Sequence, residues 1–250
     1  NANDSEDGLA FRTYQTLRSE GRLGLRVVQH IPVCNLAHAT ALGLRSGLGD
    51  AWLRVGGIKM FADGALGNRT ASMLQPFTGE PDNWGVPTTD PEEMLELALA
   101  ASAAGLSLTI HAIGDRANRD VLNVLAEVRR QETLHLRHRI EHVQVIHPAD
   151  LPRLAALDVL ASVQPIHATS DMLIVDRFWG TERAPGAYAF RSLLDSGAHL
   201  VFGSDGPIEP HAPLTGIHAA VTRRRADGTP GPAGWQPQER ITVAEAVAGV

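Results

Sequence analysis

Short apolar runs alternate along the chain with longer segments of helical periodicity. The apolar runs are rich in β-branched residues and predict six strands, at residues 23–31, 55–62, 106–112, 137–144, 159–165 and 198–204. The helical periodicity predicts helices at residues 8–21, 90–105, 115–131, 148–157 and 189–197. Strands that are apolar on both faces and separated by helices indicate a parallel α/β fold.

Two parallel architectures fit this alternation, an open doubly wound sheet and a (β/α)₈ barrel. The chain contains neither G-x-G-x-x-G nor G-x-x-x-x-G-K-[ST], which weakens a nucleotide-binding open sheet. Four polar residues lie in or just after four different expected strands: Lys59, His111, His142 and Asp205. Because a barrel brings the carboxyl ends of its strands to one mouth, the pattern predicts a TIM-like barrel.

The expected strands are too few for a complete barrel, which needs eight. About 23 residues precede the first strand, fewer than the roughly 30 of one β/α unit. Near the other end a capping box, Thr242 to Glu245, opens a helix that stops soon afterwards. We therefore expect residues 1–250 to form one incomplete barrel domain, strands three to eight of a longer protein. Long polar connections at 64–89 and 223–238 are expected to be loops at the mouth.

The composition limits the class of partner. Hydrophobic residues make up 44% and charged residues 20%, and the net charge of −6 argues against binding a nucleic-acid backbone. The one basic cluster, Arg223–Arg225, is expected to be a solvated helix end. No apolar run approaches the roughly 20 residues that span a bilayer, and the single cysteine, Cys34, excludes an internal disulfide. We expect a cytoplasmic protein with a small-molecule substrate and no nucleic-acid or membrane partner; a homo-oligomer is left open.

Lys59 is the only lysine in the chain, whereas the other 21 basic residues are arginines. It lies in an apolar strand, which suggests that its position needs an amine. Burial near cations lowers the pKa of an amine, and a neutral amine can add CO₂ to form a carbamate with two oxygen donors. A guanidinium cannot be deprotonated and cannot do this. Lys59 is therefore a candidate metal ligand, although a lone lysine could also extend its charged end to solvent.

Each of the other three residues also has a plain structural interpretation. His111 and His142 could be buried histidines bonded to backbone carbonyls, and Asp205 could sit in a turn. Their joint placement at strand ends favours a metal site. Histidine and carboxylate donors suit Zn²⁺, Fe²⁺ or Mn²⁺.

Four sequence motifs resemble those of a known family. They are "IKMFADGALGNRTA", "HAIGDRANRDVLNVL", "RIEHVQ" and "GSDGPIEPHAPLTGI", and they follow one another across most of the chain. In this order they resemble the amidohydrolase superfamily, and more narrowly amidohydrolase family 3, the branch that includes N-substituted formamide deformylases.

The resemblance implies a distorted (β/α)₈ barrel with one or two metal ions, zinc being favoured over iron or manganese. It implies that Lys59 bridges the metals, often as a carbamate, and that His111 and His142 are ligands. Asp205 would bind metal and transfer protons while a metal-activated water hydrolyses an amide-like C–N bond. Further candidates for substrate contacts lie in mouth-facing segments: Arg69, Gln164 and His167. Arg69 could instead form an ion pair, and His167 could instead cap a helix.

One departure from the family pattern matters. The family carries an H-x-H pair on its first strand, and this chain contains none. His135 and His138 are spaced H-x-x-H among arginines and are expected on the surface. Because the H-x-H pair is missing, we expect residues 1–250 alone to be inactive. Two alternatives stay open: a non-catalytic regulatory or ligand-binding barrel, and a barrel isomerase or aldolase in which Lys59 forms a Schiff base.

Overall fold

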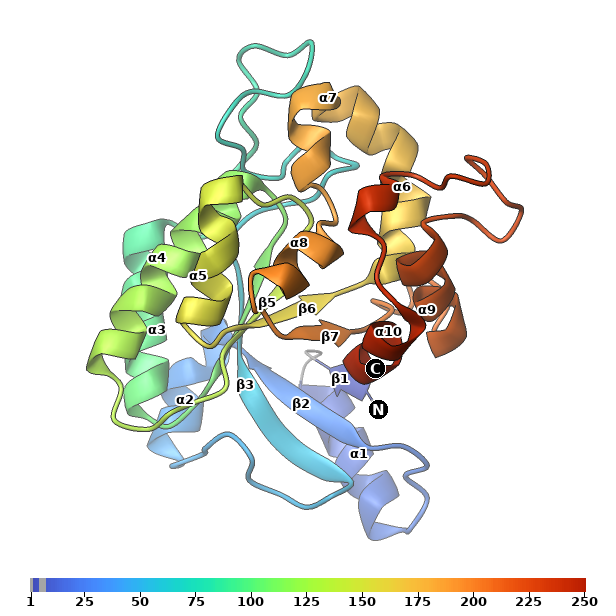
Figure 1. The fold of residues 1–250 in the computed structure, drawn as a ribbon. Coiled ribbons are helices and arrows are strands. Elements are labelled where there is room, and N and C mark those ends of the chain that lie inside the picture. Colours follow the sequence, from blue (N-terminus) through green and yellow to red (C-terminus); the bar gives the residue numbers. More distant parts are fainter. Residues whose placement is uncertain (1, 5–7) are drawn as a thin grey trace.

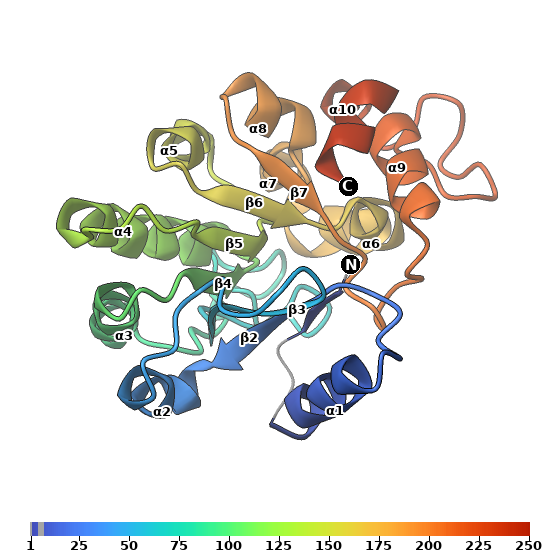
Figure 2. The ribbon, with the colours of Figure 1, turned by 90° about the horizontal axis from the view of Figure 1, so that it is seen from below.

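The computed structural model describes residues 2–4 and 8–250, with the side chains of 8–180 and 182–250. Its central feature is a sheet of seven strands in chain order, in which each strand is parallel to its neighbour. The strands are β1 (Ala2–Asp4), β2 (Val27–Pro32), β3 (Leu53–Phe61), β4 (Leu108–Ala112), β5 (Arg139–His142), β6 (Leu160–Val163) and β7 (Leu200–Phe202). Most helices lie around the outside of the curved sheet (Figures 1 and 2). Within the described residues β7 does not pair with β1, so the barrel predicted from the sequence is confirmed in incomplete form.

The six strands predicted from the apolar runs are all present, with ends that differ by a few residues. The seventh strand, β1, was not predicted, because it has only three residues, most of them polar, and therefore shows no hydrophobic pattern. It is defined by backbone pairing with β2, in which Ala2 lies beside Val27. The register along the rest of the sheet places Phe61 beside His111 and Ala112 beside His142. The carboxyl ends of these strands therefore lie at one level.

Ten α-helices accompany the strands in the described part of the chain. They are α1 (Gly8–Ser19), α2 (Leu36–Ala41), α3 (Pro91–Ala103), α4 (Asp115–Gln131), α5 (Leu151–Ala156), α6 (Pro165–Phe178), α7 (Gly180–Arg183), α8 (Phe190–Asp195), α9 (Pro213–Thr222) and α10 (Val243–Gly249). The Asp90 side chain caps α3 by accepting the Glu92 N–H, and the capping box of Thr242 and Glu245 at α10 is present. No helix in the described residues is long and apolar enough to cross a membrane.

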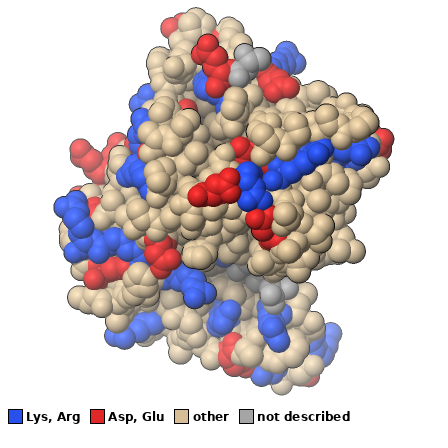
Figure 3. Space-filling view, viewed as in Figure 1, with Lys and Arg blue, Asp and Glu red and all other residues tan. Residues whose placement is uncertain are grey.

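The core lies between the outer face of the sheet and the helices. Ile58, Ile110 and Ile140 are fully buried on three successive strands, and Leu122 and Leu125 of α4 are buried with them. Burial of one such side chain contributes roughly 1.5–3 kcal/mol. On the face of the molecule that Figure 3 shows, acidic and basic side chains are intermixed. The core therefore fixes the strands whose ends form the mouth.

The basic cluster at the end of α9 is only partly a solvated helix end. Arg223 is fully buried and has a left-handed backbone with φ of 55°. Its guanidinium lies 5.3 Å from the Phe190 ring centroid and 5.0 Å from that of Trp235. It also donates hydrogen bonds to the carbonyls of Trp235 and Tyr188. The expectation of a solvated Arg223 was wrong, because two aromatic faces and two carbonyls replace water around its charge.

Replacing Arg223 by alanine is expected to lower the free energy of unfolding by about 3 kcal/mol. The change removes two ring contacts, leaves the Trp235 carbonyl without its donor, and leaves the Tyr188 carbonyl with the Phe190 N–H alone. Urea denaturation would measure it. Arg224→Ala is the matched control, since Arg224 donates only a long hydrogen bond to Gly228 (3.3 Å), and its loss should cost less than about 0.5 kcal/mol. Equal effects of the two variants would contradict the assignment of Arg223 as a buried anchor.

The two histidines of the H-x-x-H pair differ in exposure. The His135 side chain is 70% exposed, as expected, whereas His138 has no exposed surface. His138 accepts the Leu108 N–H at Nδ1 and lies 2.9 Å from Glu132 at Nε2. The surface expectation was therefore wrong for His138, which joins the end of α4 to the starts of β4 and β5.

Candidate metal centre

The carboxyl ends of the strands surround a cavity of about 530 Å³. Lys59 of β3, His142 at the end of β5, Gln164 just after β6 and Asp205 after β7 all line it. His142 and Asp205 have positive φ values of 77° and 55°, which are uncommon for residues other than glycine. Such backbone strain at a mouth is often found where side chains are held for function. Three of the four predicted metal ligands therefore face one cavity.

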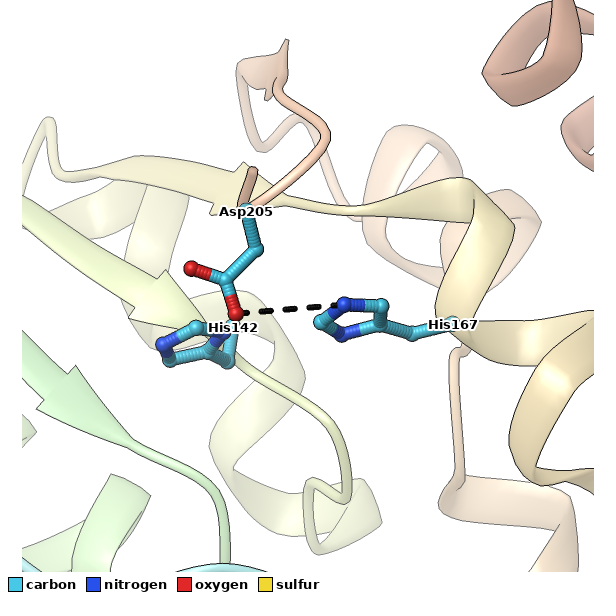
Figure 4. A group of neighbouring side chains, drawn as sticks. All are labelled: His142, His167 and Asp205. Carbon is cyan, nitrogen blue, oxygen red and sulfur yellow. Dashed lines mark ion pairs between the residues drawn. The ribbon is translucent and has the colours of Figure 1, made fainter. Parts of the chain in front are cut away.

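Three donors lie closest together at this mouth. One ligand atom each of His142, His167 and Asp205 lies within 4.8 Å of the others, and no other such group of His, Cys, Asp or Glu occurs in the described residues. His167 comes from the first turn of α6, and its Nε2 lies 3.9 Å from the Asp205 carboxylate (Figure 4). It does not cap the helix, since the N-cap position is Gln164. The cluster thus adds His167 to the donors predicted from the sequence.

The donors fit a divalent metal. The Nε2 of His167 is buried without a hydrogen-bond partner, and two imidazoles with a carboxylate are a donor set that zinc, iron and manganese accept. His142 donates from Nδ1 to the Gln164 Oε1 at 2.8 Å, which leaves its Nε2 lone pair free. The Gln144 amide lies 3.3 Å from the His167 Nδ1, and rotation that brings its Oε1 to this nitrogen would free the Nε2 lone pair in the same way.

His111 and Lys59 lie next to the cluster of His142, His167 and Asp205. The His111 ring lies edge-on to the His142 ring with 4.6 Å between centroids. The Lys59 Nζ lies 4.7 Å from the Phe61 ring centroid. Glu141 and Asp205 are close enough to Lys59 to affect its pKa. The structure therefore places all four predicted metal ligands around the mouth, with His111 beside the closest cluster rather than in it.

Burial sets the charge of these groups. It lowers the pKa of Lys59, helped by Arg139 and opposed by Glu141 and Asp205. It lowers the pKa of His111 to about 4 and that of His142 well below its ordinary value, and it raises the pKa of Asp205. The imidazoles of His111 and His142 are thus neutral at pH 7, as a metal ligand must be.

The other two residues predicted to contact substrate, Gln164 and Arg69, differ in their positions. Gln164 lines the cavity and orients His142. Arg69 forms an ion pair with Glu80 and lies over the Phe178 ring, so the structure supports its alternative role as an ion-pair partner. Gln144, two residues after His142 in "RIEHVQ", was not predicted as a site residue. Its contact with the His167 ring depends on the fold, and nothing in the sequence around a glutamine indicates such a contact.

His30 of β2 is a buried cavity residue that the sequence did not single out. Donors face both ring nitrogens: the Gly57 N–H at 2.9 Å from Nδ1 and the Arg139 guanidinium at 2.8 Å from Nε2. Burial, together with Arg139 and Lys59, lowers its pKa to about 3. The Thr109 hydroxyl lies 3.2 Å from Nδ1, and a second proton on this buried ring would add a positive charge beside the Arg139 guanidinium.

The free energy of unfolding is expected to fall as the pH falls from about 6.5 towards 3, in part through His30. The unfolded histidine takes up a proton near pH 6.5, but the folded one does so only near pH 3, so protonation favours the unfolded chain by about 1.4 kcal/mol per pH unit between these values. Urea denaturation at several pH values between 4 and 6 gives the slope of the free energy of unfolding against pH. This slope should be smaller for His30→Gln than for the wild type by about 1.4 kcal/mol per pH unit, the contribution of one proton. An unchanged slope would contradict a neutral His30.

A curved parallel sheet with histidine and carboxylate donors at its strand ends defines a barrel protein with a candidate metal site. Residues 5–250 match the model of the amidohydrolase family, and the chain belongs to this family. The resemblance predicted from the motifs is thereby confirmed.

Three similar proteins show the extent of the match. Protein LONG AFTER FAR-RED 3 of Arabidopsis thaliana is 34% identical over 96% of this chain and 42% of its own length. The N-substituted formamide deformylase of Arthrobacter pascens is 28% identical over 78% of this chain and 35% of its own length. The crystal structure of an uncharacterized metal-dependent hydrolase from Pyrococcus horikoshii OT3 has a TM-score of 0.86 and 32% identity, covering 97% of this chain and 48% of that one. The chain thus spans less than half the length of these proteins.

Proposed function

We propose that the protein is a metal-dependent hydrolase that cleaves an amide-like C–N bond in a small molecule. The observation that carries this proposal is the cluster of His142, His167 and Asp205, whose donors converge beside a cavity and include a buried nitrogen without a hydrogen-bond partner. Family membership and the similarity to an N-substituted formamide deformylase support the class of bond. A cytoplasmic location is part of the same proposal.

The bound ion, for which we propose zinc, would act as a Lewis acid and supply an activated water. His142 and His167 would hold it through Nε2, Asp205 through a carboxylate oxygen, and we propose His111, whose ring lies against that of His142, as a further ligand. The proximity of Lys59 to Asp205 and its lowered pKa support a ligand role as a carbamate formed from CO₂ and the neutral amine. The loss of a proton from nitrogen accompanies formation of the new N–C bond.

Asp205 is positioned to move a proton. Its side chain is 40% exposed, so it faces both the donor cluster and the cavity that would hold substrate. Burial raises its pKa, which makes it a stronger base than a free aspartate. We propose that it accepts a proton from the attacking water and delivers it to the departing amine. Gln164, which accepts the hydrogen bond from the His142 Nδ1, would hold the imidazole in place while this occurs.

We also propose that these 250 residues by themselves bind metal weakly and turn over little, because they lack the family's H-x-H pair. The test is metal content by elemental analysis and hydrolysis of formamides and N-acyl amino acids, for this chain and for the protein in its full natural length. We expect chelator-sensitive turnover, restored by zinc, in the full-length protein alone. A full-length protein that holds no metal and hydrolyses neither substrate class would leave the non-catalytic barrel as the better account.

A further inference from the structure

Asp63, two residues after the end of β3, is a buried carboxylate to which the reaction above gives no role. Its side chain has no exposed surface. Oδ2 accepts the N–H groups of Ser72 and Gly114, each at 2.8 Å, and Oδ1 accepts that of Ile113 at 3.0 Å. These donors belong to the long loop after β3 and to the turn between β4 and α4. One carboxylate thus ties together two segments of the mouth.

The two segments also meet through their backbones. The Ser72 carbonyl accepts the N–H groups of Arg116 and Ala117 at the start of α4. A Cβ atom on Gly114 would lie 1.9 Å from this carbonyl oxygen, so only glycine allows the approach. The contact therefore leaves the loop and the turn little freedom to shift relative to each other.

His111 lies against this junction. Its Nε2 is 2.9 Å from the Gly64 carbonyl oxygen and 3.5 Å from the Asp63 Oδ1. The Gly64 carbonyl can only accept, so Nε2 must carry the ring proton, and the neutral imidazole keeps its lone pair on Nδ1. Gly64 is held close as well, because a Cβ there would lie 2.0 Å from the Thr70 hydroxyl oxygen.

We propose that Asp63 is a positioning residue of the metal centre, which clamps the Gly64 carbonyl and the end of β4 so that His111 presents Nδ1 as the ligand nitrogen. The inference rests on the metal centre proposed above. Carboxylates and carbonyls that hold the second nitrogen of a ligating histidine fix its tautomer and orientation, and their loss typically lowers metal affinity 10- to 100-fold.

The direct test is the tautomer of His111, read from ¹⁵N chemical shifts of the ring in the metal-free full-length protein, together with the zinc affinity of that protein. Wild-type protein should show a protonated Nε2. Asp63→Asn should give a mixture of tautomers and bind zinc about 10- to 100-fold more weakly. Asp115→Asn is the matched control: Asp115 is a buried carboxylate of the same junction that accepts the Leu74 N–H at 2.8 Å, and no contact to His111 is recorded for it. This control should keep both the tautomer and the zinc affinity of the wild type.

Protonated Nδ1 in the wild type would overturn the proposal even if Asp63→Asn failed to fold. Equal losses of zinc affinity in the two variants would overturn it as well, because the junction would then act only on stability. Wild-type protein that binds no zinc would overturn the metal centre itself, while the tautomers would still decide whether Asp63 orients His111.

Discussion

Asp205→Asn is expected to lower kcat of the full-length protein by on the order of 10⁴-fold. The change keeps the size of the side chain but removes the carboxylate that lies nearest to His167 and that we assign to proton transfer. An amide is not a base, so both metal binding and proton transfer suffer at once. Steady-state kinetics with a formamide, at saturating zinc, would measure the loss.

Asp195→Asn is the matched control for this experiment. Asp195 forms an ion pair with Arg191, and its side chain is 64% exposed, so its loss should leave kcat unchanged. An Asp205→Asn enzyme that retained a tenth or more of wild-type activity would contradict the role of Asp205 as ligand and base.

Lys59→Arg is expected to lower turnover by about 10³-fold, corresponding to about 4 kcal/mol of transition-state stabilisation. A guanidinium keeps the positive charge but cannot lose a proton and cannot form a carbamate. Wild-type activity should also fall in CO₂-free buffer and return with bicarbonate, whereas the variant should respond to neither. Turnover of an amide substrate under the two conditions would measure both effects.

The control for Lys59→Arg lies on the same strand. Arg54 of β3 is exposed, and Arg54→Lys should change neither turnover nor its dependence on bicarbonate. An active Lys59→Arg enzyme would show that position 59 needs only a positive charge. Inactivation of the wild type by borohydride with a carbonyl substrate, but not by chelator, would favour the Schiff-base alternative.

Strands and amphipathic helices were predictable from the sequence because hydrophobic periodicity reports burial directly. The helix at Asp115–Gln131 was predicted with its observed ends, since its apolar stripe is regular and acidic and basic residues mark its two ends. β1 and α6 were missed for different reasons. β1 exists through backbone pairing alone, and α6 follows a strand without a turn signal, beginning at Pro165 immediately after Gln164.

The candidate site was predictable as far as strand ends mark it. Lys59, His142 and Asp205 face the cavity because the fold gathers those ends, which the alternation of strands and helices had indicated. His167 was expected at the mouth as a substrate contact, but its place beside His142 and Asp205 could not be predicted, since it depends on the direction in which α6 leaves β6. Asp63 was overlooked for a similar reason, because its partners stand 9, 50 and 51 residues away in the sequence.

The most direct test of the metal centre is anomalous X-ray diffraction at the zinc edge from crystals of the full-length protein. We predict a peak at about 2.0–2.2 Å from Nε2 of His142, Nε2 of His167 and a carboxylate oxygen of Asp205. A peak elsewhere, or no peak at saturating zinc, would contradict the assignment of these residues as a metal centre.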